Sequence, residues 1–283
     1  ATVAADTAAK LVAALDDVAG GLDVLTLKVN GATAAALDLI ALNGKTAGKI
    51  TVDAKEITGI AAAVTTVLTD AGNDFIGEEK AAVKLTTPAA VADVNAILAA
   101  TTGVVTATVN SGTAAVLVAG LTNATAKDKL TLTVTNVATT AADLLALDDK
   151  TAVKVDALAV TAISGNAADV KKLLASKGVS LAKNVNITLD ADTEVSAADV
   201  NAIAKATTGK VTATVAAGTA AALNKALGNA TKNDAITLEV SGKTATAADL
   251  LALDGKTSKK VGAAEVESIT GTVADLKKVF AAN

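Results

Sequence analysis

The side chains that could do chemistry in this sequence are carboxylates, lysines and hydroxyls. The 283 residues include no histidine, cysteine, tyrosine, methionine or tryptophan, and all 25 basic residues are lysine. Without His or Cys, no side chain titrates near neutral pH at its ordinary pKa. A Ser–Lys dyad or paired carboxylates remain open, but each candidate recurs as part of a repeat, whereas an active site needs a position unlike its neighbours. We therefore expect no enzyme activity.

One group of carboxylates has the spacing of an oxygen-ligand site. Its members lie at a turn that leads into a predicted helix, and they are Asp190, Asp192, Glu194 and Asp199. Oxygen ligands at alternate positions suit Ca²⁺. The glycine-rich nonapeptide of toxin-type calcium repeats is absent, and the matching upstream positions are Lys84, Thr86, Pro88 and Asp93. We name the four acidic residues as candidate calcium ligands, against the alternative of a solvated turn, and expect no other cofactor.

Two triplets look like the end of a phosphate-binding loop. They are Gly44-Lys45-Thr46 and Gly255-Lys256-Thr257. The upstream glycine of that motif is missing, and both triplets follow a predicted helix, whereas the motif must precede one. We interpret them as helix C-termini. Three further triplets, which begin at Asn123, Asn186 and Asn229, fit the N-glycosylation sequon, although so biased a composition produces them by chance.

Threonine occupies the outward positions of several predicted strands, as at Thr106 and Thr108 or Thr212 and Thr214. In a stacked sheet these positions would form rows of hydroxyls, as on the flat face of β-helical ice-binding proteins. Threonine is also simply a good solvent-facing strand residue. The rows are interrupted by charged residues, namely Lys28, Asp53, Lys84, Lys154, Asp156 and Glu239. Ice binding is therefore a remote alternative.

The chain repeats itself at an offset of 106 residues. Residues 94–97 recur as 200–203, and residues 140–148 recur as 246–254. An older copy lies upstream, where Ala1-Thr2-Val3 matches residues 107–109. The copies are therefore residues 1–106 and 107–212, followed by the partial copy 213–283.

Each copy divides into four similar quarters. In the second copy, alternating apolar residues predict strands at 105–109, 130–134, 153–157 and 185–189. Each helical run opens with a capping residue, and the candidates are Thr140, Asn166, Ser196, Thr246 and Thr272. An aspartate follows each cap after three residues, where it favours the positive end of the helix dipole. Helix ends are predicted near Gly103, Gly178, Gly209 and Gly255.

These elements predict an α/β fold, specifically a right-handed β/α solenoid of about eleven coils with roughly 26 residues each. Because a helix separates consecutive strands, the strands must be parallel. A doubly wound sheet would also satisfy that rule, but the uniform coil length favours a solenoid with a parallel sheet on one face and helices on the other. We expect residues 1–283 to form a single solenoid, whose narrow core needs only Ala, Val, Leu and Ile.

Charge and hydropathy exclude two classes of partner. The net charge is −4, arginine is absent and only two residues are aromatic, so nucleic-acid binding is not expected. No apolar run approaches the roughly 18 residues of a membrane span.

The runs at 140–148, 253–257 and 269–276 together resemble the Ala/Thr/Val/Asp-rich repeats of giant bacterial cell-surface or secreted proteins. Those proteins are surface-layer-like, and some carry toxin-type calcium repeats elsewhere. The resemblance implies an extracellular or cell-surface location and a structural or adhesive role. It carries over no functional residues.

We therefore expect a structural repeat protein that assembles with itself head-to-tail into a filament, surface layer or stalk. The sequence starts and stops inside the repeat, without a signal-peptide pattern, as an excised piece of a longer polypeptide would. Uncapped solenoid ends expose a sheet edge and an apolar layer, which stacking would cover. The alternative is an adhesin that uses the solenoid face to contact a glycan or a cell surface.

Overall fold

The structure is a computed structural model, and it describes residues 1–18, 23–69 and 74–281. Within these ranges the chain is a mixed α/β protein with eleven α-helices. It divides into two compact units, residues 1–134 with 146–156 and residues 135–145 with 157–283. The predicted α/β class is confirmed, and a single solenoid over the whole chain stays a prediction.

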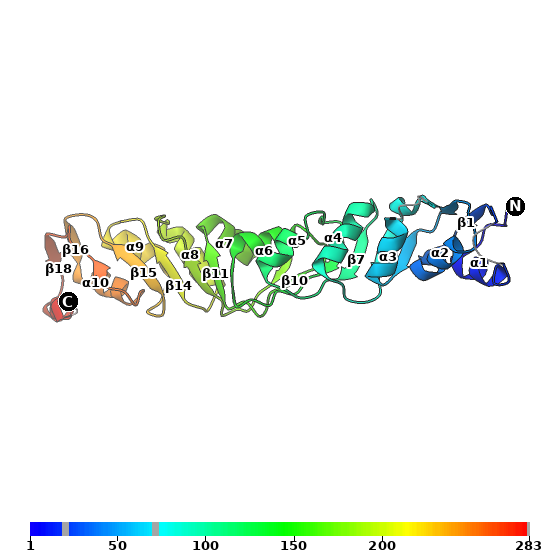
Figure 1. Ribbon diagram of the computed structural model, residues 1–283. Helices are drawn as coiled ribbons and strands as arrows, with labels where there is room; N and C mark the ends of the chain where they lie inside the picture. Colours follow the sequence, from blue (N-terminus) through cyan, green and yellow to red (C-terminus); the bar gives the residue numbers. More distant parts are fainter. Residues whose placement is uncertain (19–22, 70–73, 282–283) are drawn as a thin grey trace. The chain divides into compact units, whose positions relative to one another are not determined.

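The α-helices are short and regularly spaced (Figure 1). They are α1 (Ala8–Ala14), α2 (Ala36–Asn43), α3 (Ala61–Leu68), α4 (Val91–Ala100), α5 (Ala114–Gly120), α6 (Ala141–Asp148), α7 (Ala167–Ala175), α8 (Ala197–Ala206), α9 (Ala220–Ala226), α10 (Ala247–Asp254) and α11 (Val273–Ala281). A single 3₁₀ turn in the described ranges, η1, covers Glu78–Lys80.

The strands are shorter still. They are β1 (Leu27–Val29), β2 (Thr33–Ala35), β3 (Ile50–Val52), β4 (Glu56–Gly59), β5 (Phe75–Ile76), β6 (Ala82–Leu85), β7 (Val105–Thr108), β8 (Lys129–Thr131), β9 (Ala138–Thr140), β10 (Val155–Asp156), β11 (Ala162–Gly165), β12 (Val179–Ser180), β13 (Asn186–Leu189), β14 (Val211–Thr214), β15 (Ala235–Glu239), β16 (Thr244–Thr246), β17 (Val261–Gly262) and β18 (Ser268–Thr270).

The 106-residue period is visible in the positions of the helices. Helices α4, α5, α6 and α7 begin at Val91, Ala114, Ala141 and Ala167, and α8, α9, α10 and α11 begin 106 residues later, at Ala197, Ala220, Ala247 and Val273. We call each helix, with the strand or strands before it, a strand–helix segment. Four successive segments therefore make one repeat copy, as the quarters of the sequence predicted.

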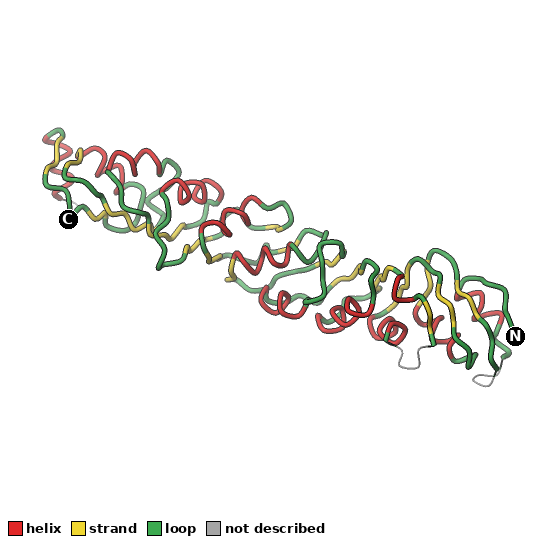
Figure 2. The backbone as a smooth tube through the Cα atoms, turned by 90° about the horizontal axis from the view of Figure 1, so that it is seen from above, coloured by secondary structure: helices red, strands yellow, loops and turns green. Residues whose placement is uncertain are grey.

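Strand pairing follows the order of the segments. In the first unit the strands pair in the orders β1-β3-β5 and β2-β4-β6-β7-β8. In the second unit the orders are β17-β15-β14-β13-β11-β9 and β16-β18. These pairings are parallel, with registers such as Ile57 opposite Val83 and Ile163 opposite Ile187. Consecutive helices pack against one another from α1 to α5 and from α7 to α11, and Figure 2 shows these helices in red.

The number of strands per segment differs from the prediction. We expected one strand per coil in one sheet, but most segments contain two short strands that belong to different sheets, such as β3 and β4. Asp53, Ala54 and Lys55 separate this pair, and the chain turns there. Alternation in the sequence does not reveal this corner, because an apolar residue, Ala54, is buried inside the turn as well.

The core contains small aliphatic side chains in thin layers. Strand residues alternate between buried and exposed, as in β1, where Leu27 and Val29 are buried and Lys28 is exposed. Helices α1 to α10 each add buried apolar residues, such as Val200 and Ile203 of α8. Full burial of one such side chain contributes about 1.5–3 kcal/mol. Side chains on one face recur every two residues in a strand and every 3.6 residues in a helix, and both patterns place apolar side chains in the same core.

Helices end within three residues of the four predicted glycines, but of these glycines only Gly255 is itself the capping residue. None of Gly103, Gly178, Gly209 and Gly255 is among the positive-φ glycines, so they do not supply the left-handed residue that often ends a helix. Gly103 and Gly209 are instead required by close packing, because a Cβ there would lie 2.1 Å from the Ala81 carbonyl oxygen and 2.3 Å from that of Val185. Gly255 does cap α10, in a right-handed conformation.

In the described part of the chain, every helix is too short, or not apolar enough, to cross a lipid bilayer.

Candidate functional site

The candidate calcium ligands lie around the start of α8. Asp190, Glu194 and Asp199 line a pocket of about 300 Å³, together with the caps Asn166 and Ser196. Asp192 is exposed and is not among the residues that line this pocket. The structure thus brings three of the four predicted residues to one place and leaves the fourth outside.

Asp199 is already engaged by protein groups. Its backbone N–H donates to Ser196 Oγ at 3.1 Å, and the Ser196 hydroxyl donates to Asp199 Oδ2 at 2.9 Å. Lys171 of α7 forms an ion pair with the same carboxylate. The hydrogen bond from Lys171 and then that from Ser196 lower the pKa of Asp199, although desolvation partly opposes them. Asp199 therefore joins two neighbouring helices and stabilises the first turn of α8.

The arrangement of the acidic side chains does not resemble a coordination shell. Within the residues described, no three or more His, Cys, Asp or Glu side chains are grouped so that they could hold a metal ion. Asp190, Asp192 and Glu194 are exposed to solvent. Calcium binding by these residues stays a prediction.

The Gly-Lys-Thr triplets connect neighbouring segments. Gly44 and Gly255 cap α2 and α10, which confirms their interpretation as helix C-termini. The following lysine reaches back to the preceding segment, where Lys256 Nζ donates to the Leu227 carbonyl oxygen at 2.9 Å. A lysine near the last carbonyls of a helix is favourable for the helix dipole. Lys45 and Lys150 make the same kind of contact.

The threonine of these triplets is a residue that sequence reasoning missed. Thr257 is fully buried, and its Oγ1 accepts hydrogen bonds from Ile236 N at 3.0 Å and Lys259 N at 3.1 Å. Its hydroxyl also donates to the Ile236 carbonyl oxygen at 2.6 Å. One hydroxyl thereby completes the hydrogen bonds at the start of a neighbouring strand. Equivalent contacts are made by Thr46, Thr101, Thr151 and Thr207.

Two of the sequon-like triplets also join segments. Asn123 N donates to Asn95 Oδ1 at 2.9 Å, and the Thr125 hydroxyl donates to Asp128 Oδ2 at 3.0 Å. Asp128 is buried and accepts the N–H of Val105 from the preceding segment at 2.9 Å. The later copy repeats this pattern with Asn201, Val211, Asn229, Thr231 and Asp234. Packing between segments thus explains why Asn, Thr and Asp recur here.

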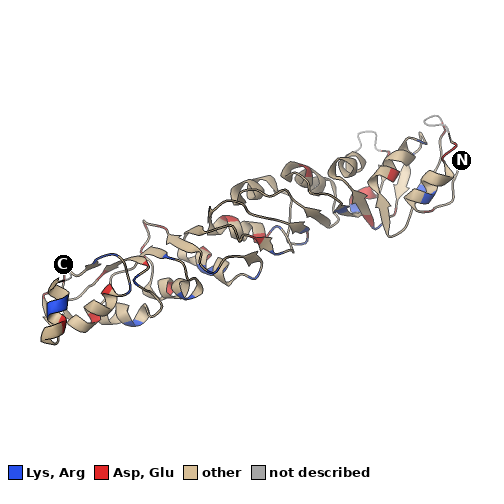
Figure 3. Ribbon diagram, turned by 90° about the horizontal axis from the view of Figure 1, so that it is seen from below, with Lys and Arg blue, Asp and Glu red and all other residues tan. Residues whose placement is uncertain are grey.

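The predicted threonine rows are short. Thr108 lies opposite Thr131, but Thr106 lies between Lys84 and Lys129. A longer row of hydroxyls crosses β9, β11, β13 and β14, and it consists of Thr140, Ser164, Thr188 and Thr212. Charged residues of both signs are distributed along both units, as the blue and red parts of the ribbon in Figure 3 show. Ice binding stays a prediction that these contacts do not test.

Comparison of the chain with protein-family models, with curated proteins and with solved structures finds no match. Its function is therefore inferred from its own residues.

Proposed function

We propose that this chain is a structural segment of an extracellular bacterial protein, built as one right-handed solenoid of strand–helix segments. The observation that carries the proposal is the use of the polar side chains. The recurring Lys, Thr, Asn and Asp residues bind the neighbouring segment and hold the stack together.

The contacts of one segment illustrate this use. Lys256 and Thr257 bind main-chain atoms 29 and 21 residues earlier in the sequence. Asp234 accepts the Val211 N–H, 23 residues earlier, at 2.8 Å. Each separation is about one segment long, so these bonds run between adjacent segments. Side chains that form such bonds hold adjacent segments together, which agrees with a mechanical role.

The order of strand pairing supports the proposed solenoid arrangement. Parallel strands that pair with the preceding and following segments, each linked through a helix, stack in sequence order, and right-handed crossovers are strongly preferred. In such an arrangement the helices cover one side of the stack. Each segment contacts only its neighbours, so further segments can be added to the stack through the same kind of contact.

Stacks of this kind suit a filament, a surface layer or a stalk. β18 is an edge strand in its sheet, and its main-chain groups can pair with a further strand. Contacts between unlike ends repeat without closing, which produces fibres. The extracellular location rests on the resemblance of the runs at 140–148, 253–257 and 269–276 to repeats of bacterial surface proteins.

Electron microscopy combined with light scattering over a range of protein concentrations tests the proposal. We expect fibres or sheets whose mass increases with concentration. Monomers that stay dispersed at every concentration would overturn self-assembly. Thermal melting in the same solutions provides a check that the dispersed protein is folded.

A further inference from the structure

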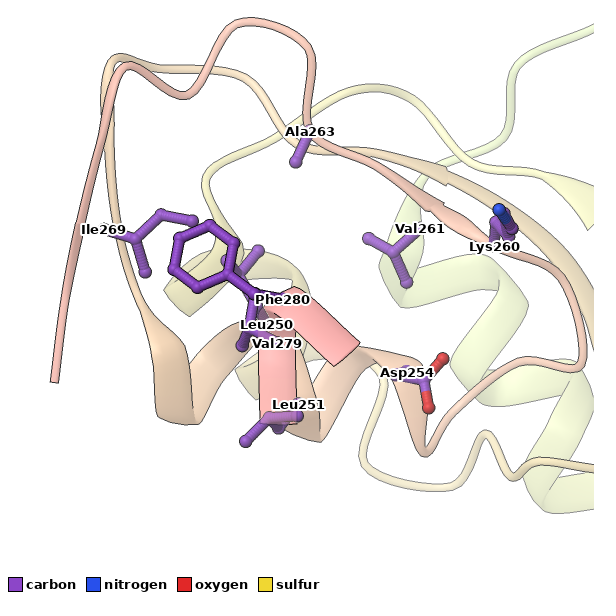
Figure 4. A pocket seen from close by; sticks show the side chains of 9 residues that line it. All are labelled: Leu250, Leu251, Asp254, Lys260, Val261, Ala263, Ile269, Val279 and Phe280. Atoms are coloured by element: carbon purple, nitrogen blue, oxygen red, sulfur yellow. The ribbon is translucent and has the colours of Figure 1, made fainter. Parts of the chain in front are cut away.

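The last described segment has an open groove that is lined by apolar side chains and by the charged residues Asp254 and Lys260 (Figure 4). The groove has a volume of about 230 Å³, and Figure 4 shows its lining, which includes Leu250, Val261, Ile269, Val279 and Phe280. Phe280, one of the residues that line the groove, is 65 % exposed. We call these five residues the α11 face. Large apolar side chains gathered in one exposed patch are typical of a binding surface.

The repeat itself shows what covers a face of this type. Ile163 and Leu173, the counterparts of Ile269 and Val279 at an offset of 106 residues, are each only 1 % exposed. They are covered because β13 pairs with β11 and α8 packs against α7.

In the older copy, the corresponding residues are covered in the same way. Ile57 of β4 and Val67 of α3 hold the corresponding positions and are fully buried. There β6 pairs with β4, and α4 packs against α3. In both copies, the covering segment is therefore of one type, the type that contains α4 or α8.

Two polar groups beside the α11 face, on Lys277 and Gly271, also match this type of segment. Lys277 is exposed and corresponds to Lys171, which pairs with Asp199 of the covering α8 segment. The Gly271 carbonyl oxygen corresponds to that of Gly165, which accepts the Asp190 N–H at 3.3 Å. The counterpart in the older copy, the Gly59 carbonyl oxygen, accepts the Thr86 N–H at 2.9 Å.

We propose that the α11 face binds a strand–helix segment of the α4/α8 type, in preference to the other three types. The sequence signature of that partner is Asp-Val-Asn-Ala-Ile, found at 93–97 and 199–203, followed by Ala-Thr-Thr-Gly, found at 100–103 and 206–209. This inference rests on the proposed stacking of strand–helix segments and goes beyond head-to-tail assembly, which would place α1, a segment of the α5/α9 type, on the α11 face. Binding buries Ile269 and Val279, pairs β18 and supplies an aspartate for Lys277. It covers Phe280 in part, since its counterparts Leu174 and Leu68 are half-buried.

A single-tryptophan reporter tests the proposal, because the chain contains no tryptophan. In the Phe280→Trp protein, a copy of residues 178–209 is appended after Asn283. We expect a blue-shifted emission and an acrylamide quenching constant at least twofold lower than in the protein without the extension. The matched control carries a copy of residues 210–241, which is equally long and of a different type, and its tryptophan should stay as exposed as before.

Equal quenching with both extensions would overturn the preference for the α4/α8 type, and unchanged quenching with both would overturn the binding. A blue shift of the protein without an extension, on concentration alone, also counts against it, since a second copy then covers the face. Protection in extended but monomeric protein supports this inference while refuting self-assembly. Fibres of the protein without an extension whose tryptophan becomes protected support head-to-tail self-assembly while refuting this inference.

Discussion

At the scale of single residues, the buried threonines carry the largest energetic consequence. In Thr257→Val the shape of the side chain is kept, but the N–H groups of Ile236 and Lys259 lose their acceptor. Leaving a buried donor unsatisfied costs about 1–3 kcal/mol. We expect the free energy of unfolding to fall by that amount, measured by denaturant titration, and the Ile236 amide to exchange faster with solvent.

Thr188→Val is the matched control for this prediction. Thr188 is also on a strand of the second unit, but it is exposed. Surface substitutions of this kind usually change stability by less than about 0.5 kcal/mol. If the two valine variants were equally stable, the hydroxyl of Thr257 would have no special role.

The Asp199 carboxylate predicts a pH dependence at the same scale. Because Lys171 and Ser196 lower its pKa below the ordinary value of 3.8, the folded state favours its charged form. The resulting stability is present above that ordinary value and is lost as the pH falls through the lower pKa of the folded state. An NMR titration of the carboxyl group should show this low pKa. Lys171→Met should raise it, and Lys172→Met should leave it unchanged.

These residue roles were predictable from the sequence to different extents. The helix caps could be predicted, because a cap and its aspartate lie three residues apart, and all five predicted caps accept the expected N–H. The roles of Thr257 and Asp234 could not, since their partners lie 21–23 residues away on another segment. The same limit applies to Asp199, a candidate calcium ligand by its spacing, because its partner Lys171 lies 28 residues earlier on another helix.

At the scale of elements, the helix caps differ between the copies. Ser196 caps α8 with its side chain, whereas Ala90, its counterpart before α4, has no side chain that can do so. Ala90 already has an N-cap conformation, with φ −65° and ψ 150°, and Asp93 already follows. We expect Ala90→Ser to stabilise the protein by about 0.5–1 kcal/mol, measured from the midpoint of denaturant unfolding.

Ser196→Ala provides the reverse experiment. It should cost about 1 kcal/mol, since it leaves a first-turn N–H without its acceptor. If Ser196→Ala lowers the free energy of unfolding but Ala90→Ser does not raise it, something other than the helix cap limits the stability of the older copy. The strands offer no such simple forecast, because their division into two sheets depends on corners such as Asp53–Lys55, where the chain turns between pairing partners.

At the scale of the whole molecule, each segment type has a fixed neighbour. Removal of residues 107–212 takes out one full period, so α9 then follows α4 in the place of α5. Since α5 and α9 belong to the same type, every interface between segments is preserved. Stability in such a stack is a sum over segments and their nearest-neighbour contacts. We expect the shortened protein to fold, with an unchanged circular dichroism spectrum per residue and an m-value reduced in proportion to its length.

Removal of residues 114–166 is the decisive comparison. It takes out half a period, so that α7 follows α4, a junction between segment types that occurs nowhere in the described chain. Apolar side chains at the new junction then face unmatched shapes, and packing mismatches of this kind cost about 1–3 kcal/mol each. We expect dye binding to exposed apolar surface and a lower unfolding midpoint for this variant alone. If both deletions gave equally stable proteins, the four segment types would be interchangeable, and the preference proposed for the α11 face would lose its basis.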